Sequence, residues 1–291
     1  MHFVQAKTIL SPHNGMNIYR GCTHGCIYCD SRSKCYHTPE PFEDVEVKEN
    51  APELLEAALK KKRKKCMIGT GSMCDPYMHC EEKLLLTRRC LEIINRYGFG
   101  ATVITKSDLV LRDLDLLKSI SEKSKAVVQM TLTTANDELC RKVEPNVCPT
   151  SCRVEVLKIF RKENIPTIVW LSPFLPGINN TKENFESLLA MCADAGVKGI
   201  INFGIGLTLR EGNREYYYSK LDEKFPGLKD RYVQHYRDSY NLMSSNNSEL
   251  MKYFNFFCSQ YGIIHTPEKC FEYLNEFPEK QEPVYLRLRI K

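Results

Sequence analysis

Short apolar segments alternate with amphipathic segments along the first two thirds of the chain. Between the apolar segments, apolar residues recur at three- and four-residue spacing, which is the pattern of amphipathic helices. Strands alternating with helices are typical of a parallel α/β sheet. The pattern therefore predicts a partial (β/α)6 TIM-like barrel, whose six strands are Met16–Tyr19, Cys66–Gly69, Ala101–Thr105, Val127–Thr131, Thr167–Leu171 and Gly199–Phe203.

Several of the intervening helices have recognisable ends. Asn50, followed by Pro52 and Glu53, predicts a helix start with a capping box. A second helix is predicted from Glu81 to Tyr97, where Gly98 stops it. Further helices are expected at residues 150–163 and from Thr181 to just before Gly196, whereas residues 136–143 have the composition of a turn.

The pattern changes after Phe203, where three helical segments are predicted at residues 214–224, 230–240 and 249–261. We expect them to pack against or over the open side of the barrel. No linker-like stretch separates them from the core, so residues 1–291 are predicted to form one domain, with a core at about 10–210 and a helical extension at about 211–291. Residues 283–291 could form a terminal strand or a loose tail.

The composition indicates the size class and cellular compartment of the protein more than its function. The 291 residues fit one large domain, and 43% hydrophobic residues supply an ample core. A net charge of +5 permits a nucleic-acid partner without favouring one, and the basic run at residues 60–65 is expected to be a solvated helix end. The N-terminus lacks a signal-peptide pattern and no apolar run reaches the length of a membrane span. We expect a cytoplasmic protein, without membrane partners, whose 14 cysteines are reduced.

The most specific chemistry in the chain is a group of three cysteines at C-x3-C-x2-C spacing: Cys22, Cys26 and Cys29. Structural zinc sites and electron-transfer clusters usually have four protein ligands. Three thiolates on a four-iron cluster leave one iron open for chemistry. Cys35, with His24 or His37 nearby, could instead close a four-ligand site, but no second paired motif lies close by. The open cluster is the favoured interpretation.

This loop, with Tyr28 just before the third cysteine, resembles the cluster loop of the radical S-adenosylmethionine (SAM) superfamily. In that family, the amino and carboxylate groups of SAM chelate the fourth iron of a [4Fe-4S] cluster. An electron from an external flavodoxin- or ferredoxin-like donor then releases a 5′-deoxyadenosyl radical. Further segments resemble the spore photoproduct lyase-like branch, over about residues 10–210, namely 16–22, 69–77, 86–92, 104–107, 143–145 and 173–177.

The resemblance implies roles for individual residues. Gly69, Thr70 and Gly71 would lie beside the methionyl part of SAM, in a turn where glycine permits close approach. Asp75 would pair with the SAM amino group or order a neighbouring loop, and Cys74 stands where the branch usually carries Ser or Thr. The remaining implied contacts are the SAM carboxylate for Lys106, the ribose or carboxylate for Thr131 and Thr133, and the adenine for Tyr28. An ion pair between Arg141 and Glu144 would brace this face.

The departures from the branch bear on the reaction. Ser72 stands where spore photoproduct lyase has its hydrogen-donating cysteine, and Asp30 stands where it has a tyrosine. We therefore do not predict repair of spore photoproduct, although Cys74 could be a displaced donor. Cys140, Cys148 and Cys152 could donate hydrogen or bind a second metal or cluster. Four other cysteines are expected to be small core residues: Cys66, Cys90, Cys192 and Cys258.

The C-terminal part offers the clues to a substrate. Its mixture of rings and cations, from Tyr216 to Arg237, could stack bases and hold phosphates, but packing on the barrel is favoured. Arg210 and Arg214 are better placed for an anionic substrate. The leading hypothesis is hydrogen abstraction from a nucleic-acid base or nucleotide. The alternatives are the same chemistry on a peptide or small metabolite, or a non-catalytic iron–sulfur or zinc protein. The sequence leaves the radical-quenching residue and the oligomeric state open.

Overall fold

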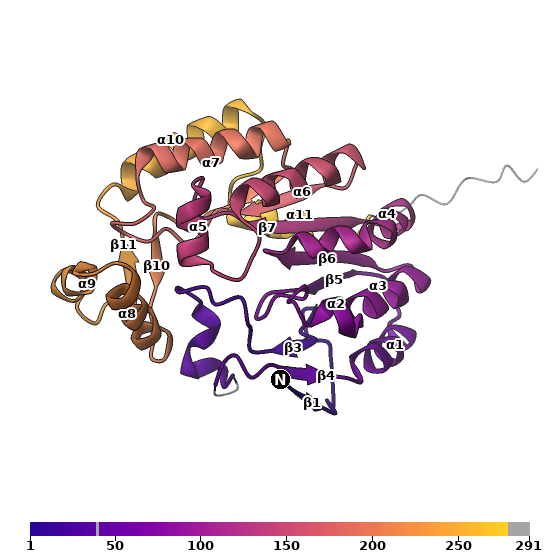
Figure 1. Cartoon of the computed structure of the whole chain (residues 1–291). Helices are drawn as coiled ribbons and strands as arrows, with labels where there is room; N and C mark the ends of the chain where they lie inside the picture. Colours follow the sequence, from indigo (N-terminus) through magenta and orange to yellow (C-terminus); the bar gives the residue numbers. More distant parts are fainter. Residues whose placement is uncertain (39–40, 279–291) are drawn as a thin grey trace, which may run out of the picture.

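Six parallel strands form the central sheet of the protein, in the order β2–β5–β6–β7–β8–β9 (Figure 1). The structure is a computed structural model and describes residues 1–38 and 41–278. The strands are β2 (Gly15–Met16), β5 (Met67–Thr70), β6 (Gly100–Thr105), β7 (Ala126–Thr131), β8 (Thr167–Trp170) and β9 (Gly199–Ile201). Sequential neighbours joined by helical crossovers confirm the predicted partial barrel.

The first predicted strand is divided between two sheets. β2 ends at Met16, and β3 (Tyr19–Arg20) pairs antiparallel with β4 (Glu46–Lys48), which pairs with β1 (His2–Val4). Tyr19 is fully buried and its hydroxyl donates to the carboxylate of Glu81. This contact holds Tyr19 in the second sheet, so the chain leaves the central sheet after Met16. A run of apolar residues does not indicate such a change of sheet.

Alternating strand residues separate two apolar layers. One face packs on the helices α1 (Ala51–Lys61), α3 (Leu86–Arg96), α4 (Leu114–Lys123), α6 (Thr150–Lys162) and α7 (Lys182–Ala195). The opposite face, with Met67, Val127 and Ile168, packs on the last described helix, α11 (Pro267–Asn275). Because α11 fills part of this face, the remaining space lies toward the carboxyl ends of the strands.

Three local predictions were wrong. The predicted helix 81–97 breaks at Leu85, which has a φ of +55°, into α2 (Glu81–Leu84) and α3, because the buried Glu81 carboxylate accepts the Thr87 N–H. Residues 136–143 form a helix, α5 (Asp137–Val143), which the Asn136 side chain caps. The expected capping box at α1 is absent, because the Asn50 side chain bonds the backbone of Ala6 instead.

The chain after β9 contains the three predicted helices. It also contains a fourth helix and an antiparallel pair of strands, which the sequence pattern did not indicate. Its helices are α8 (Asn213–Lys224), α9 (Leu228–Tyr236), α10 (Asn247–Gln260) and α11, and its antiparallel pair is β10 (Gly206–Thr208) with β11 (Asn241–Met243). Leu207, Tyr217 and Leu221 pack with Tyr28 of the cysteine loop, so the extension covers that loop. The predicted segment 283–291 lies outside the described residues.

The aromatic residues of the extension serve packing, as predicted. Tyr217 and Tyr232 are buried, the Tyr217 hydroxyl donates to that of Tyr232 at 3.0 Å, and Tyr232 donates to the carbonyl oxygen of Pro176. Within residues 1–38 and 41–278, none of the helices has both the length and the apolar character needed to span a membrane.

Candidate active site

The loops at the carboxyl ends of the strands surround one large cavity of about 750 Å³. This edge of the sheet is where parallel α/β folds bind ligands. Its walls come from many parts of the barrel: the cysteine loop, residues 69–75 at the end of β5 and after it, residues 104–106 at the end of β6, and residues on β7, β8 and β10. The cavity therefore brings most of the predicted site residues together.

Cys22, Cys26 and Cys29 all line this cavity. The loop that carries them turns at Gly21, which has a φ of +79° and where a Cβ would collide with the carbonyl oxygen of Phe42, so only glycine fits. The Ile27 N–H donates to the carbonyl oxygen of Val143 at 3.0 Å and anchors the loop to the end of α5.

Cys26 is buried, and Cys22 and Cys29 are partly buried. Burial raises the pKa of Cys26 to about 12, and burial followed by the neighbouring Cys26 thiol raises the pKa of Cys22 well above its ordinary value. Thiolates here need a compensating positive charge, which bound iron ions supply. The donor set and its burial thus fit an iron–sulfur cluster.

The candidate fourth ligand is not in place. Cys35 lies in a short 3-10 helix (Lys34–Tyr36), is exposed, and accepts a weak hydrogen bond from Arg210 at 3.5 Å. It is not among the residues that line the cavity. The buried His24 does line it, but its Nδ1 lies 3.4 Å from the carboxylate of Asp75. This arrangement favours three cysteine ligands over four.

Gly69, Thr70 and Gly71 line the same cavity as the cysteine loop. Gly71 has a φ of +101°, and a Cβ there would collide with the carbonyl oxygen of Ile104. The strands β5 and β6 therefore approach each other more closely than any other residue type would permit. Cys74 is buried at the same wall and donates to the carbonyl oxygen of Tyr19 at 2.7 Å.

Asp75 orders the loop that follows β6. Its carboxylate accepts three hydrogen bonds, from the Tyr77 N–H at 2.8 Å, the Thr105 hydroxyl at 2.7 Å and the Lys106 N–H at 2.7 Å. Of the two roles predicted for Asp75, the structure supports the ordering of a neighbouring loop. The same contacts hold Lys106 at the cavity wall.

Behind Lys106 lies a buried polar network centred on Glu144. The carboxylate accepts from the Tyr28 hydroxyl, from Thr133 at 3.3 Å and from the guanidinium of Arg153 at 2.6 Å. The predicted pair of Glu144 with Arg141 was therefore wrong. Arg153 sits on the buried face of α6, where periodicity alone predicts an apolar residue.

This network also decides which predicted residues reach the cavity. Thr131, Tyr28 and Lys106 line it, whereas Thr133 is fully buried against Glu144 and is not part of the lining. Burial alone would lower the pKa of Lys106, but the Cys26 thiol and the Glu144 carboxylate raise it above its ordinary value. The lysine is therefore a cation in the cavity wall, 5.9 Å from the centre of the Tyr28 ring.

An aromatic wall, which the sequence analysis missed, lines the cavity at the end of β8. The Trp170 indole donates to the Gln129 side chain at 2.7 Å, and its ring lies about 6 Å from those of Phe203 and Phe271. Gln129 in turn donates to the hydroxyl of Thr102 at 2.7 Å. These residues share no motif, and the fold alone brings them together.

Arg210 and Arg214, which the sequence suggested for binding an anionic substrate, make different contacts. Arg214 donates to the backbone carbonyl oxygens of Leu209 and Ser239, which makes it a structural residue. Arg210 is not among the residues that line the cavity, but it donates to the hydroxyl of Tyr36, which is, and to that of Tyr240. Three of the four expected core cysteines, Cys90, Cys192 and Cys258, are fully buried, and Cys66 is half-buried.

Comparison with known proteins gives the site a context. A family model described as the radical SAM superfamily matches residues 16–192. An uncharacterised protein of Mycobacterium bovis is 30% identical over 230 residues, which cover 76% of this chain and 66% of that protein. The chain thus matches just under two thirds of that relative's length. A protein of Methanocaldococcus jannaschii is 29% identical over 80% of both chains.

Two further matches have descriptive names. A protein of Pseudomonas phage M6 named radical SAM Nalpha-GlyT isomerase is 24% identical, over 58% of this chain and 35% of that protein. A solved structure of spore photoproduct lyase with bound AdoMet and dinucleoside spore photoproduct superposes with a TM-score of 0.60, at 11% identity, over 86% of this chain and 74% of that one. At this identity the superposition shows a shared fold.

Proposed function

Because the chain belongs to the radical SAM superfamily, we propose that Cys22, Cys26 and Cys29 hold a [4Fe-4S] cluster at which it reductively cleaves SAM to abstract hydrogen from a nucleic-acid base or nucleotide. When bound, the cluster and SAM supply one-electron cleavage and a 5′-deoxyadenosyl radical. The observation that carries the proposal is the position of all three thiols in the wall of one cavity at the carboxyl ends of the strands. An external flavodoxin- or ferredoxin-like donor would supply the electron.

The chain's own residues would bind and orient the cofactors. Lys106, a half-buried cation in the cavity wall, would donate a charge-assisted hydrogen bond to the SAM carboxylate. Gly69, Thr70 and Gly71 would let the methionyl part approach the backbone closely. Asp75 would act by holding the Lys106 backbone in position rather than by direct contact.

Tyr28, Cys74 and Thr131 would complete the cofactor wall, Tyr28 toward the adenine. Thr133 would contribute through Glu144, since it does not line the cavity. The aromatic wall at Trp170 and the antiparallel pair β10–β11 would exclude water from the substrate side, which protects a reactive radical from side reactions.

Two observations support a nucleic-acid substrate. The rings of Trp170, Phe203 and Phe271 offer faces on which a flipped or single-stranded base can stack. Arg210, which bonds the cavity-lining Tyr36 and lies 4.0 Å from Asp30, would supply a cation for a phosphate. The dinucleoside bound in the spore photoproduct lyase structure points in the same direction.

The test of the chemistry is anaerobic. The reconstituted and reduced protein is given SAM, and 5′-deoxyadenosine is measured by mass spectrometry. We expect C26A to lose both iron and product, whereas the matched variant C35A keeps both. Product formation that survives C26A, or that disappears in C35A together with iron, would contradict the three-ligand assignment.

The test of the substrate uses oligonucleotides deuterated on the bases or sugars. We expect deuterium to appear in 5′-deoxyadenosine, and binding to weaken as salt rises, because phosphate contacts release counterions. Deuterium transfer from a peptide or small metabolite instead, with binding to oligonucleotides absent or insensitive to salt, would favour the alternative substrate class.

A further inference from the structure

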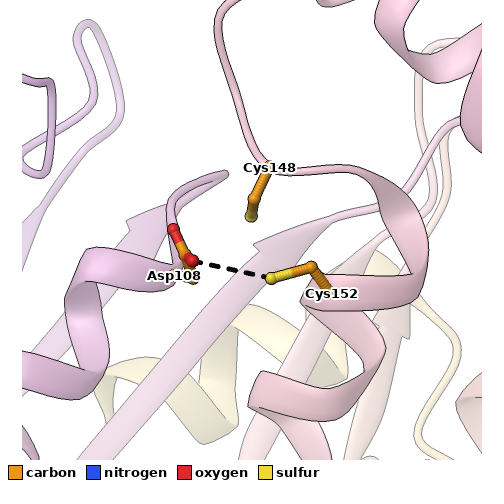
Figure 2. A group of neighbouring side chains, drawn as sticks. All are labelled: Asp108, Cys148 and Cys152. Atoms are coloured by element: carbon orange, nitrogen blue, oxygen red, sulfur yellow. Dashed lines mark hydrogen bonds between the residues drawn. The ribbon is translucent and has the colours of Figure 1, made fainter.

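Three side chains with metal-binding atoms meet outside the cysteine loop: Asp108, Cys148 and Cys152 (Figure 2). Their ligating atoms all lie within 4.8 Å of one another, and the Cys152 thiol lies 3.6 Å from the Asp108 carboxylate. The three side chains point toward a common centre from two elements. Asp108 begins the 3-10 helix η3 (Asp108–Asp113) after β6, Cys148 lies two residues before the start of α6, and Cys152 lies in the first turn of α6.

The sequence had grouped Cys148 and Cys152 with Cys140, but the structure separates them. Cys140 lies in the buried network, with its thiol 3.4 Å from Glu144 and 3.6 Å from Arg153. It therefore faces other partners. Two thiols and a carboxylate remain at the site, which are too few sulfur ligands for a second iron–sulfur cluster of the usual four-cysteine type.

We propose that Asp108, Cys148 and Cys152 bind a zinc ion that clamps the loop after β6 to the start of α6. Two thiolates and one carboxylate are a ligand set that suits zinc, whereas magnesium and calcium prefer oxygen ligands alone. Binding releases the two thiol protons to solvent. Asp108 is exposed and both cysteines are partly exposed, so water can complete a tetrahedral shell.

The position of this site gives it a consequence for the cavity. The Cys148 thiol donates to the backbone carbonyl oxygen of Lys106 at 3.2 Å, and the Cys148 carbonyl oxygen accepts from Arg153 at 2.9 Å. Zinc binding would replace the bond from the Cys148 thiol to Lys106, because the thiol gives up its proton. The metal would instead tie Asp108, two residues after Lys106, to Cys148, whose carbonyl oxygen accepts from Arg153 of the Arg153–Glu144 pair. The metal would be a positioning element, and it would not touch the cavity lining formed by Cys22, Cys26 and Cys29.

The experiment measures bound zinc in the cluster-loaded protein. Wild type is reconstituted anaerobically with reductant, incubated with zinc chloride, desalted, and analysed for zinc and iron per chain. We expect about one zinc beside four irons. In C152S and D108N the zinc should fall at least tenfold while the iron is unchanged. The variant C35S is the matched control, because it removes an exposed thiol elsewhere, and it should keep its zinc.

X-ray absorption at the zinc edge distinguishes this site from misloading of the cysteine loop. The proposed site gives two sulfur ligands at about 2.3 Å with oxygen ligands at about 2.0 Å, whereas the loop would give three sulfurs. Loss of Cys26 should remove iron and leave this zinc in place, so the site and the proposed function fail independently. Substoichiometric zinc in wild type, zinc retained by both C152S and D108N, or a Cys148–Cys152 disulfide in the reduced protein would overturn the proposal.

Discussion

The buried pair of Arg153 and Glu144 should be the most sensitive point outside the cavity lining. Both side chains are fully buried, the ions are 2.6 Å apart, and Arg153 also donates to the carbonyl oxygens of Thr131 and Cys148, each at 2.9 Å. Arg153→Ala leaves the carboxylate without this partner. Removing one member of a buried ion pair costs about 3–5 kcal/mol. At about 2–4 °C per kcal/mol for a chain near this size, the melting temperature should fall by roughly 6–20 °C.

The stability that Arg153→Ala loses should be larger at high pH than at low pH. In the wild type, burial pushes the pKa of Glu144 upward, but Arg153 and Lys106 hold it below its ordinary value. That contribution to stability is present above the unfolded pKa and is lost as pH falls through the folded pKa. Without Arg153, burial should raise the folded pKa above the unfolded one, so the stabilisation is lost as pH rises. The variant should therefore lie further below wild type at pH 8 than at pH 6.

Calorimetry of the cluster-loaded proteins under anaerobic conditions provides the assay. The double variant Glu144→Gln with Arg153→Met serves as the matched control, because it removes both charges and keeps much of the volume. It should recover at least half of the lost melting temperature, since replacing both members of a buried pair is often close to neutral. The reasoning is refuted if Arg153→Ala costs less than about 1 kcal/mol, or if the double variant is no more stable than the single one.

Three further changes test the cavity. Gly71→Ala would make a Cβ collide with a carbonyl oxygen of β6, so thermal scans should show a loss of stability and calorimetric titration should show a loss of SAM binding. The control Gly98→Ala, at a φ of +66° with open space around it, should bind SAM like wild type. Asp75→Asn keeps the shape of the side chain but weakens three charge-assisted hydrogen bonds, so SAM affinity measured by titration should fall about tenfold, corresponding to about 1.4 kcal/mol. An unchanged affinity would contradict the role of Asp75 in ordering the loop after β6. Trp170→Phe removes the hydrogen bond to Gln129 but keeps an aromatic ring, so 5′-deoxyadenosine formation should persist while substrate-dependent deuterium transfer falls severalfold. Deuterium transfer equal to that of wild type would contradict a contact between Trp170 and the substrate.

The parts of the site that the sequence predicted are those encoded by local spacing. Cys22, Cys26 and Cys29 lie within one loop, and Gly69, Thr70 and Gly71 lie at the end of one strand, so contiguous residues carry the signal. The alternation of apolar and amphipathic segments likewise predicted the six-stranded sheet, because strand and helix periods are local properties.

The parts that the sequence left undecided depend on long-range contacts. The choice of Arg153 over Arg141 as the partner of Glu144 follows from which face of α6 meets β7, and sequence separation carries no information on that point. The break at Leu85 follows from Glu81 being bonded by residues on either side of it in the chain.

The amino-acid sequence by itself thus determined the sheet, the cysteine loop and the class of chemistry that the loop indicates. The tertiary structure alone decided that Cys35 lies away from the cavity, that Asp108 joins Cys148 and Cys152, and that Trp170 faces the ligand space. The physical reason is that each of these outcomes depends on packing between segments tens of residues apart. Such packing is fixed by which buried faces fit together, and a local pattern does not record it.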